Sequence, residues 1–360
     1  MPYRRIVLTA FLCWAAQAQQ SSQQTAPEAV DTPIERTTVN FVLAPVTVKD
    51  GAGSIVNGLQ PAQFKLFDNG KEQDIRVDVA FQPISMVIAI EASDRVDAIL
   101  TQIHKIGPLI EPLVIGDQGE AAVLAFDHRL QELQGFTNDA TKIEKAVQKI
   151  HAGSTSSRMI DAVDRAVFML RSRPPNRRRI VMLISETRDK ASEGKIKDAL
   201  IDAQLSNVSV YAIDISQIAR RLTEKAQPPR PDPFPPAARN LPGGQPSTPT
   251  TVQHATGLGS RIEFVPMLVE IYKDTKGIFV DNPVEVFTKG TGASEFSFIQ
   301  QRGLEKAIQS ISQEVHSQYL ISYNPNNKSE GGFHEITVQL DRRDLKVQTR
   351  PGYWLASLKQ

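Results

Sequence analysis

The sequence predicts an α/β fold: a doubly wound, mostly parallel sheet with helices on both faces, together with a smaller β-sandwich-like region. Continuous apolar runs between residues 83 and 286 fit strands that are buried on both faces of a parallel sheet. Helical stripes of apolar residues separate these runs, and this alternation is typical of open α/β sheets. Short strands before and after the segment predict the second region. The apolar runs lie at 86–90, 121–126, 180–184 and 208–213.

The start of the chain has the pattern of a secretory signal peptide. Arg4 and Arg5 precede an apolar run at 6–16, which ends in the small-x-small pattern of a cleavage site. We expect residues 1–18 to be removed and residues 19–37, rich in Gln, Ser, Thr and Pro, to form a flexible linker. No later apolar stretch approaches membrane length. The predicted protein is therefore exported, periplasmic or extracellular, and without a transmembrane segment after the signal is removed.

Short strands are predicted at both ends of the mature chain. Residues 38–82 contain about three of them, with a hairpin turn at 68–70, and Pro45 suggests an edge strand or a bulge. Residues 317–354 contain three more, separated by turn residues. Because a few strands without a covered face are only marginally stable, we expect the two groups to pair into one β-sandwich-like region.

Residues 83–316 form the expected α/β domain, which is interrupted by a proline-rich segment at 224–258. This segment holds nine of the 23 prolines, a density that prevents helix and central strand. Two interpretations remain open: an exposed loop without a role, and a polyproline II ligand for a protein partner. The contact residues of the second would be Pro231, Pro233, Phe234 and Pro235.

Composition and motif content argue against several functions. Lys and Arg number 41 against 40 Asp and Glu, so the chain lacks the positive surplus of a general nucleic-acid-binding protein. The only cysteine, Cys13, leaves with the signal peptide. No GxSxG, HExxH or phosphate-loop motif is present, and the six histidines are scattered. We therefore predict that the protein is not an enzyme.

Polar side chains gather where predicted strands end. The first buried strand runs into Glu91 and Ser93, and a later strand runs into Glu186. Thr155 lies in a Gly/Ser/Thr loop before a predicted helix. These positions fall at the carboxyl edge of the sheet, where open α/β folds bind ligands. Oxygen ligands from three turns are what a hard cation such as Mg²⁺ needs.

In order and spacing, these residues resemble a von Willebrand factor type A domain. That fold carries a metal-ion-dependent adhesion site built from an Asp-x-Ser-x-Ser turn, a Thr and an Asp. The whole layout, with an FKLFDNGK hairpin near the start and an SQYLISY strand and RPGYW near the end, resembles the acidobacterial von Willebrand factor A-related exported proteins. The resemblance covers about residues 38–354 and implies a protein-binding module.

The motif departs from the family pattern at three positions. Glu91 and Glu186 stand where the family has Asp, and Arg95 stands where it has the last Ser; Ser93 and Thr155 match. We therefore predict a degenerate site, an ion pair centred on Arg95 with either Glu91 or Glu186 as its partner, and no cofactor, with Mg²⁺ or Mn²⁺ possible but not favoured. A simpler interpretation is that Ser93 and Asp94, and likewise Thr155 and Ser156, only cap the helices that follow them.

Three functions follow from these observations. The first is an exported, non-catalytic module that binds an unknown protein partner through the degenerate site. The second is a structural or assembly component of an envelope complex. A secreted hydrolase is a distant third, because its catalytic groups would have to meet in space without a sequence motif.

Overall fold

A computed structural model describes residues 41–78, 82–223, 259–273, 282–297, 303–342 and 344–355. All of them belong to one compact unit. The predicted signal peptide, the linker and the proline-rich insertion with Pro231, Pro233, Phe234 and Pro235 lie outside the described residues.

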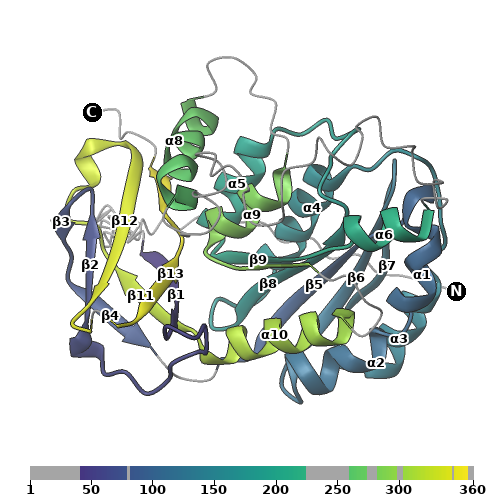
Figure 1. The fold of residues 1–360 in the computed structure, drawn as a ribbon, viewed down its shortest axis with the longest axis horizontal. Coiled ribbons are helices and arrows are strands. Elements are labelled where there is room, and N and C mark those ends of the chain that lie inside the picture. The colour runs from purple at the N-terminus through teal and green to yellow at the C-terminus, as the bar shows by residue number, and fades with distance from the viewer. Residues whose placement is uncertain are drawn as a thin grey trace, which may run out of the picture. The chain divides into compact units, whose positions relative to one another are not determined.

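A six-stranded sheet forms the centre of the α/β domain (Figure 1). Its spatial order is β10-β9-β8-β5-β6-β7, and all neighbours are parallel except β6 and β7. The order runs outward in both directions from β5, which is the doubly wound arrangement expected from the sequence. The strands are β5 (Ile84–Glu91), β6 (Glu120–Phe126), β7 (Leu130–Thr137), β8 (Arg178–Ser185), β9 (Val208–Asp214) and β10 (Glu295–Ser297).

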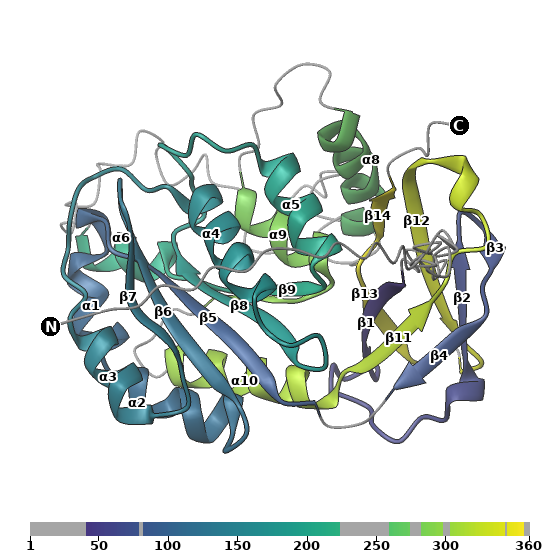
Figure 2. The ribbon, with the colours of Figure 1, turned by 180° about the vertical axis from the view of Figure 1, so that it is seen from behind.

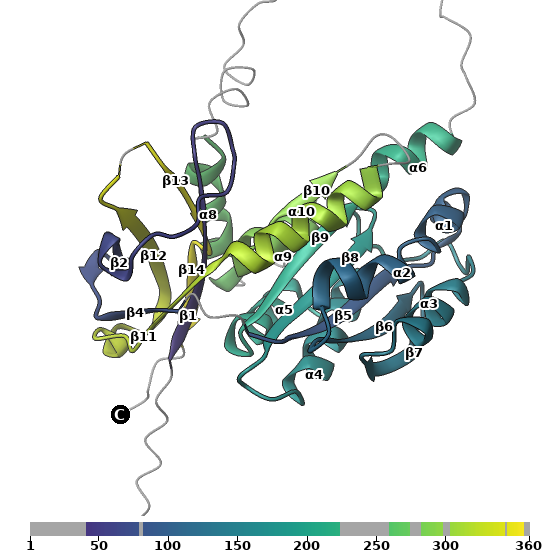
Figure 3. The ribbon, with the colours of Figure 1, turned by 90° about the horizontal axis from the view of Figure 1, so that it is seen from below.

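Helices cover both faces of this sheet, and each face has its own apolar core (Figure 3). The apolar run of β5 serves both, because alternate residues such as Ile88 and Ala89 point to opposite faces. On the first face lie α1 (Asp97–Ile103), α2 (Gly107–Ile110), α3 (Ala140–Gln148), α6 (Ser216–Thr223) and α10 (Gly303–Ser317). On the second lie α4 (Met159–Arg171), α5 (Ile196–Leu205), α8 (Gly259–Lys273) and α9 (Pro283–Thr291).

Strands from the two ends of the chain form two four-stranded antiparallel sheets (Figure 2). Their orders are β13-β1-β11-β4 and β14-β12-β2-β3, so both sheets mix N- and C-terminal strands. One apolar cluster draws on both sheets and includes Val46, Leu66, Ile321 and Ile336. The strands are β1 (Val42–Lys49), β2 (Phe64–Asp68), β3 (Lys71–Glu72), β4 (Ile75–Asp78), β11 (Tyr319–Tyr323), β12 (Gly332–Leu340), β13 (Lys346–Thr349) and β14 (Gly352–Leu355).

The predicted fold class, an α/β sheet with a β-sandwich-like region, is confirmed by this architecture. The expectation that Pro45 marks an edge strand or a bulge is wrong, because β1 lies between β13 and β11. Pro45 pairs with Leu320 on one side, whereas pairing with β13 begins only at Val46. At Pro45 itself β1 therefore has one neighbour, so the proline lies at a local edge of the pairing although the strand as a whole is central.

Several elements were missed by the sequence analysis. The edge strand β7 shows little apolar alternation, and β10 and β14 are short. Short helical turns also occur: η1 (Pro61–Gln63), η2 (Asp94–Val96), η3 (Glu111–Ile115) and η5 (Lys328–Glu330). No helix among the described residues is long and apolar enough to cross a membrane.

Candidate functional site

Four acidic residues stand at the carboxyl ends of four neighbouring strands of the central sheet. Glu91 ends β5, Asp127 follows β6, Glu186 follows β8 and Asp214 ends β9. Their exposed fractions are only 1%, 1%, 6% and 7%. Sequence analysis found Glu91 and Glu186 but missed Asp127, although the same signal, an acid directly after an apolar run, was present there.

Both carboxylate oxygens of Glu91 are occupied by hydrogen bonds. The Ser93 hydroxyl donates to Oε1 at 2.8 Å, and the backbone N–H of Glu186 donates to Oε2 at 2.8 Å. Burial raises the pKa of Glu91 to about 7, and these two hydrogen bonds work against that rise without cancelling it. Glu91 is therefore a protonated or half-protonated acid near neutral pH, held in one position.

Arg95 forms the ion pair of the site, and its partner is Glu186. The Arg95 Nε lies 3.0 Å from Oε2 of Glu186. The side chain of Arg95 is 36% exposed, whereas that of Glu186 is 8% exposed. The Arg95 guanidinium therefore links the buried carboxylate of Glu186 to the solvent-exposed side of the site. When Glu91 is protonated, Glu91, Arg95 and Glu186 together carry no net charge.

Thr155 has a different partner from the one that the adhesion motif implies. Its hydroxyl donates to Oδ2 of Asp94 at 2.9 Å, and both residues are exposed. The structure thus brings together Glu91, Ser93, Arg95 and Glu186, and places the Thr155 hydroxyl on the surface beside Asp94.

The capping interpretation of Ser93 and Thr155 is wrong. Neither supplies a side-chain cap, because the hydroxyl of Ser93 goes to Glu91 and that of Thr155 to Asp94. The first turn of α4 is instead satisfied from a distant loop. Asp189 accepts from the Ile160 N–H at 2.7 Å, and Ser192 accepts from the Asp161 N–H at 3.1 Å. A cap supplied across 29 residues leaves no local sequence signal.

A serine, a histidine and an aspartate also meet at this edge. The Nδ1 atom of His128 lies 2.7 Å from the Ser154 hydroxyl and 3.1 Å from Oδ2 of Asp127. A catalytic relay needs the two ring nitrogens of histidine to contact different partners, one the nucleophile and the other the acid. Here a single nitrogen faces both, so the cluster cannot pass a proton from Ser154 to Asp127 through the ring.

Asp127 acts as a structural anchor for the loop that carries Ser154. Burial tends to raise the pKa of Asp127, but hydrogen bonds from the backbone N–H groups of Arg129 and Ser154 outweigh it, and the pKa lies below its usual value. A Cβ on Gly153 would lie 2.1 Å from the Asp127 carboxylate, so only glycine allows this approach.

The residues at this edge do not fit a divalent cation of the adhesion-site type. The oxygens of Glu91 already accept two hydrogen bonds, Arg95 holds Glu186, and Thr155 points to Asp94. No group of three or more His, Cys, Asp or Glu within the described ranges is arranged to hold a metal ion. A permanent guanidinium charge beside the carboxylates further opposes a cation.

Neither a protein-family profile nor any curated protein matches the chain. Solved structures to which the chain is similar include BatB from Bacteroides thetaiotaomicron, with 15% identity and a TM-score of 0.32 over 36% of this chain and 66% of that one. An aerotolerance-related membrane protein from Bacteroides fragilis matches with 13% identity and a TM-score of 0.39, over 64% and 99%. A von Willebrand factor type A protein from Catenulispora acidiphila matches with 12% identity and a TM-score of 0.34, over 52% and 45%. The chain thus spans less than half of the last protein, and proteins titled as von Willebrand factor type A domains are among the structures it is similar to.

Proposed function

We propose that the chain is an exported, non-catalytic protein-binding module that contacts its partner through the carboxyl edge of the central sheet without a metal ion. The observation that carries this proposal is the Arg95–Glu186 ion pair, whose Nε–Oε2 distance is 3.0 Å. It places a fixed guanidinium at the edge where open α/β sheets bind their ligands.

The edge has the layered character of a polar contact surface. Its floor consists of buried groups whose hydrogen bonds are satisfied within the chain, such as Glu91 and Ser93. Its rim consists of Asp94, Arg95, Thr155 and half-exposed His128, all able to pair with a partner's polar groups. A rigid floor under such a rim lowers the ordering cost of binding.

Photo-crosslinking from the rim tests the proposal. A photoreactive amino acid replaces Thr155 in the native host, and a matched variant carries it at the exposed Lys65 on β2. We expect a discrete adduct from position 155, unchanged in EDTA, and none of the same mass from position 65. Adducts that vanish with chelator would contradict a metal-independent surface.

Two alternatives give different results. A structural or assembly component would co-purify with its partner in fixed stoichiometry and would not dissociate on dilution. A hydrolase would cleave generic esters or peptides, and this activity would be lost in Ser154→Ala. Neither result is expected, because the His128 geometry lacks a relay and the rim is polar and exposed.

A further inference from the structure

An apolar groove lies between α4 and the edge strand β7, on the second face of the central sheet (Figure 2). Its volume is about 540 Å³, and its apolar lining comes from Phe136, Phe168 and Met169. The side chain of Phe168 is 61% exposed. A single exposed aromatic residue is ordinary, but one that stands beside an apolar groove marks a surface for protein contact.

Two arginines hold the aromatic rings of this groove in place. The guanidinium of Arg165 lies 5.0 Å from the centre of the Phe168 ring and forms an ion pair with Glu132. The guanidinium of Arg173 lies 4.8 Å from the centre of the Phe136 ring. Both rings are therefore ordered before any partner arrives, which lowers the entropic cost of binding.

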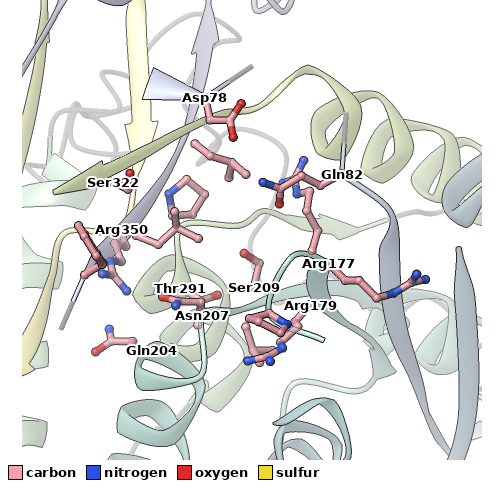
Figure 4. A pocket seen from close by; sticks show the side chains of 17 residues that line it. Asp78, Gln82, Arg177, Arg179, Gln204, Asn207, Ser209, Thr291, Ser322 and Arg350 are labelled. Atoms are coloured by element: carbon pink, nitrogen blue, oxygen red, sulfur yellow. The ribbon is translucent and has the colours of Figure 1, made fainter. Parts of the chain in front are cut away.

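The end of α4 is also fixed to the end of α5. Figure 4 shows Arg179 among the side chains of the cavity at the amino ends of β8 and β9. Arg179 donates to the carbonyl oxygens of Arg173 at 2.6 Å and Ser206 at 3.0 Å, which follow α4 and α5. On the outside, the Nη1 of Arg171 lies 3.7 Å from Oδ2 of Asp202. The exposed face of α4 is therefore a rigid surface.

An acid and a base flank Phe168 on this face. Asp164 precedes it by four residues and Arg171 follows it by three, so the three side chains share one side of the helix. Asp164 forms no ion pair with another described residue. Burial raises its pKa, and the carboxylates of Asp202 and Asp161 raise it further. A second guanidinium beside Asp164 would therefore be stabilising.

The stripe of Asp164, Phe168 and Arg171 is complementary to itself. Asp164 and Arg171 are equally distant in sequence from the midpoint between residues 167 and 168. Two copies of α4 that pack antiparallel about a two-fold axis at this midpoint place Asp164 of each copy opposite Arg171 of the other. The two Phe168 side chains then meet close to the axis. Such an interface, in which the same patch meets itself, is the usual arrangement of a homodimer.

We propose that this face of α4 is a homodimer interface, in which α4 packs antiparallel against α4 of a second copy of the chain. Phe168 forms the apolar centre, and two reciprocal Asp164–Arg171 pairs fix the orientation. A different protein would have to supply the same three groups in reverse order, and the chain already supplies them. Phe168 lies in the last turn of α4, far from the carboxyl edge, so the dimer presents two free edges and doubles their valency.

Sedimentation velocity of the purified mature protein at micromolar concentrations tests the proposal. We expect a monomer–dimer equilibrium that shifts toward the dimer as the concentration rises. Phe168→Ser removes the apolar centre and should raise the dissociation constant of the dimer by about tenfold or more. Phe41→Ser is the matched control, because Phe41 is 55% exposed but lies in the β-region, and it should leave the constant unchanged.

Charge reversal tests the antiparallel geometry and keeps the test decisive if Phe168→Ser does not fold. Asp164→Arg and Arg171→Asp each place like charges opposite one another, so each should weaken the dimer. The double variant restores opposite charges across the axis and should recover most of the lost affinity.

A protein that remains monomeric at every concentration overturns the proposal and leaves the groove to a different protein. A dimer that neither Phe168→Ser nor the single charge reversals weaken also overturns it, as does one that the double variant fails to restore. The proposal does not rest on the carboxyl-edge function, which none of these outcomes affects.

Discussion

Two buried carboxylates, Glu91 in the α/β domain and Asp68 in the β-region, show how differently this chain uses the same chemistry. Asp68 is fully buried and accepts hydrogen bonds from four side chains. Its donors are Tyr323 at 2.9 Å, Tyr353 at 2.9 Å, Asn327 at 3.0 Å and the Nδ1 of His334 at 2.7 Å. Glu91 accepts hydrogen bonds from only two donors. One of them is the backbone N–H of Glu186, whose side chain pairs with the partly exposed Arg95.

The difference separates stability from recognition. The donors to Asp68 come from β11, β12, β14 and the turn at 327, so the carboxylate links an N-terminal strand to C-terminal ones. The four side chains that donate to Asp68 are all buried, so a ligand in solvent cannot reach its carboxylate. Glu91 instead anchors a cluster that reaches the surface, and only there can a partner be contacted.

The largest expected effect follows from removing the C-terminal strands. A chain truncated after residue 316 lacks β11, β12, β13 and β14, which are the neighbours of β1, β2 and β4. We expect residues 41–78 to lose their hydrogen-exchange protection, because their backbone groups and apolar faces would have no cover. Unchanged protection there would mean that the N-terminal strands are stable by themselves.

Asp68→Ala should have the next largest effect. It leaves four buried donors without an acceptor, and we expect a loss of about 3–5 kcal/mol in the free energy of unfolding. Urea unfolding measures this loss. Asp74→Ala, at an exposed position beside β4, is the matched control and should change stability by less than about 0.5 kcal/mol. Similar losses in both variants would show that the Asp68 cluster does not hold the sheets together.

The Glu91 carboxyl should make stability depend on pH. Its pKa is raised from 4.5 to about 7 in the folded protein. Between these values the unfolded chain has released the proton and the folded chain has not, so the Glu91 contribution falls as pH rises. The loss from about pH 4.5 to about pH 7 is of the order of 3 kcal/mol.

Glu91→Gln cannot titrate and isolates this contribution. We compare the free energies of unfolding of the wild type and of Glu91→Gln between about pH 4.5 and about pH 7. As the pH rises through this interval, the wild type should lose about 3 kcal/mol of stability relative to Glu91→Gln. Parallel stability curves for the two proteins would show that Glu91 is ionised throughout.

The sequence predicts those features whose signals lie close together in the chain, and it misses those that depend on distant partners. The buried strands and their carboxyl-edge acids were found because an apolar run and the polar residue after it are adjacent in the chain. The Arg95–Glu186 ion pair was one of two that the sequence predicted, because the positively charged Arg95 occupies a position where the family motif has an oxygen ligand. The cap of α4 by Asp189 and the role of His334 could not be predicted, since their partners lie far away in sequence.

Asp68 illustrates the same limit. The sequence predicts the hairpin turn at 68–70, and the positive φ angles of Asn69 (47°) and Gly70 (77°) fit such a turn. The same pattern places Asp68 at the turn with no hint of burial. Only the packing of the two sheets brings Tyr323, Tyr353 and His334 to its carboxylate.

Calorimetric titration with Mn²⁺ tests the central claim most directly, that the carboxyl edge works without a metal ion. The titrated protein lacks residues 1–18, and Glu91→Ala serves as the comparison. The account predicts no stoichiometric binding, because Arg95 holds Glu186 and both oxygens of Glu91 are occupied. Stoichiometric binding at micromolar affinity that disappears in Glu91→Ala would contradict it.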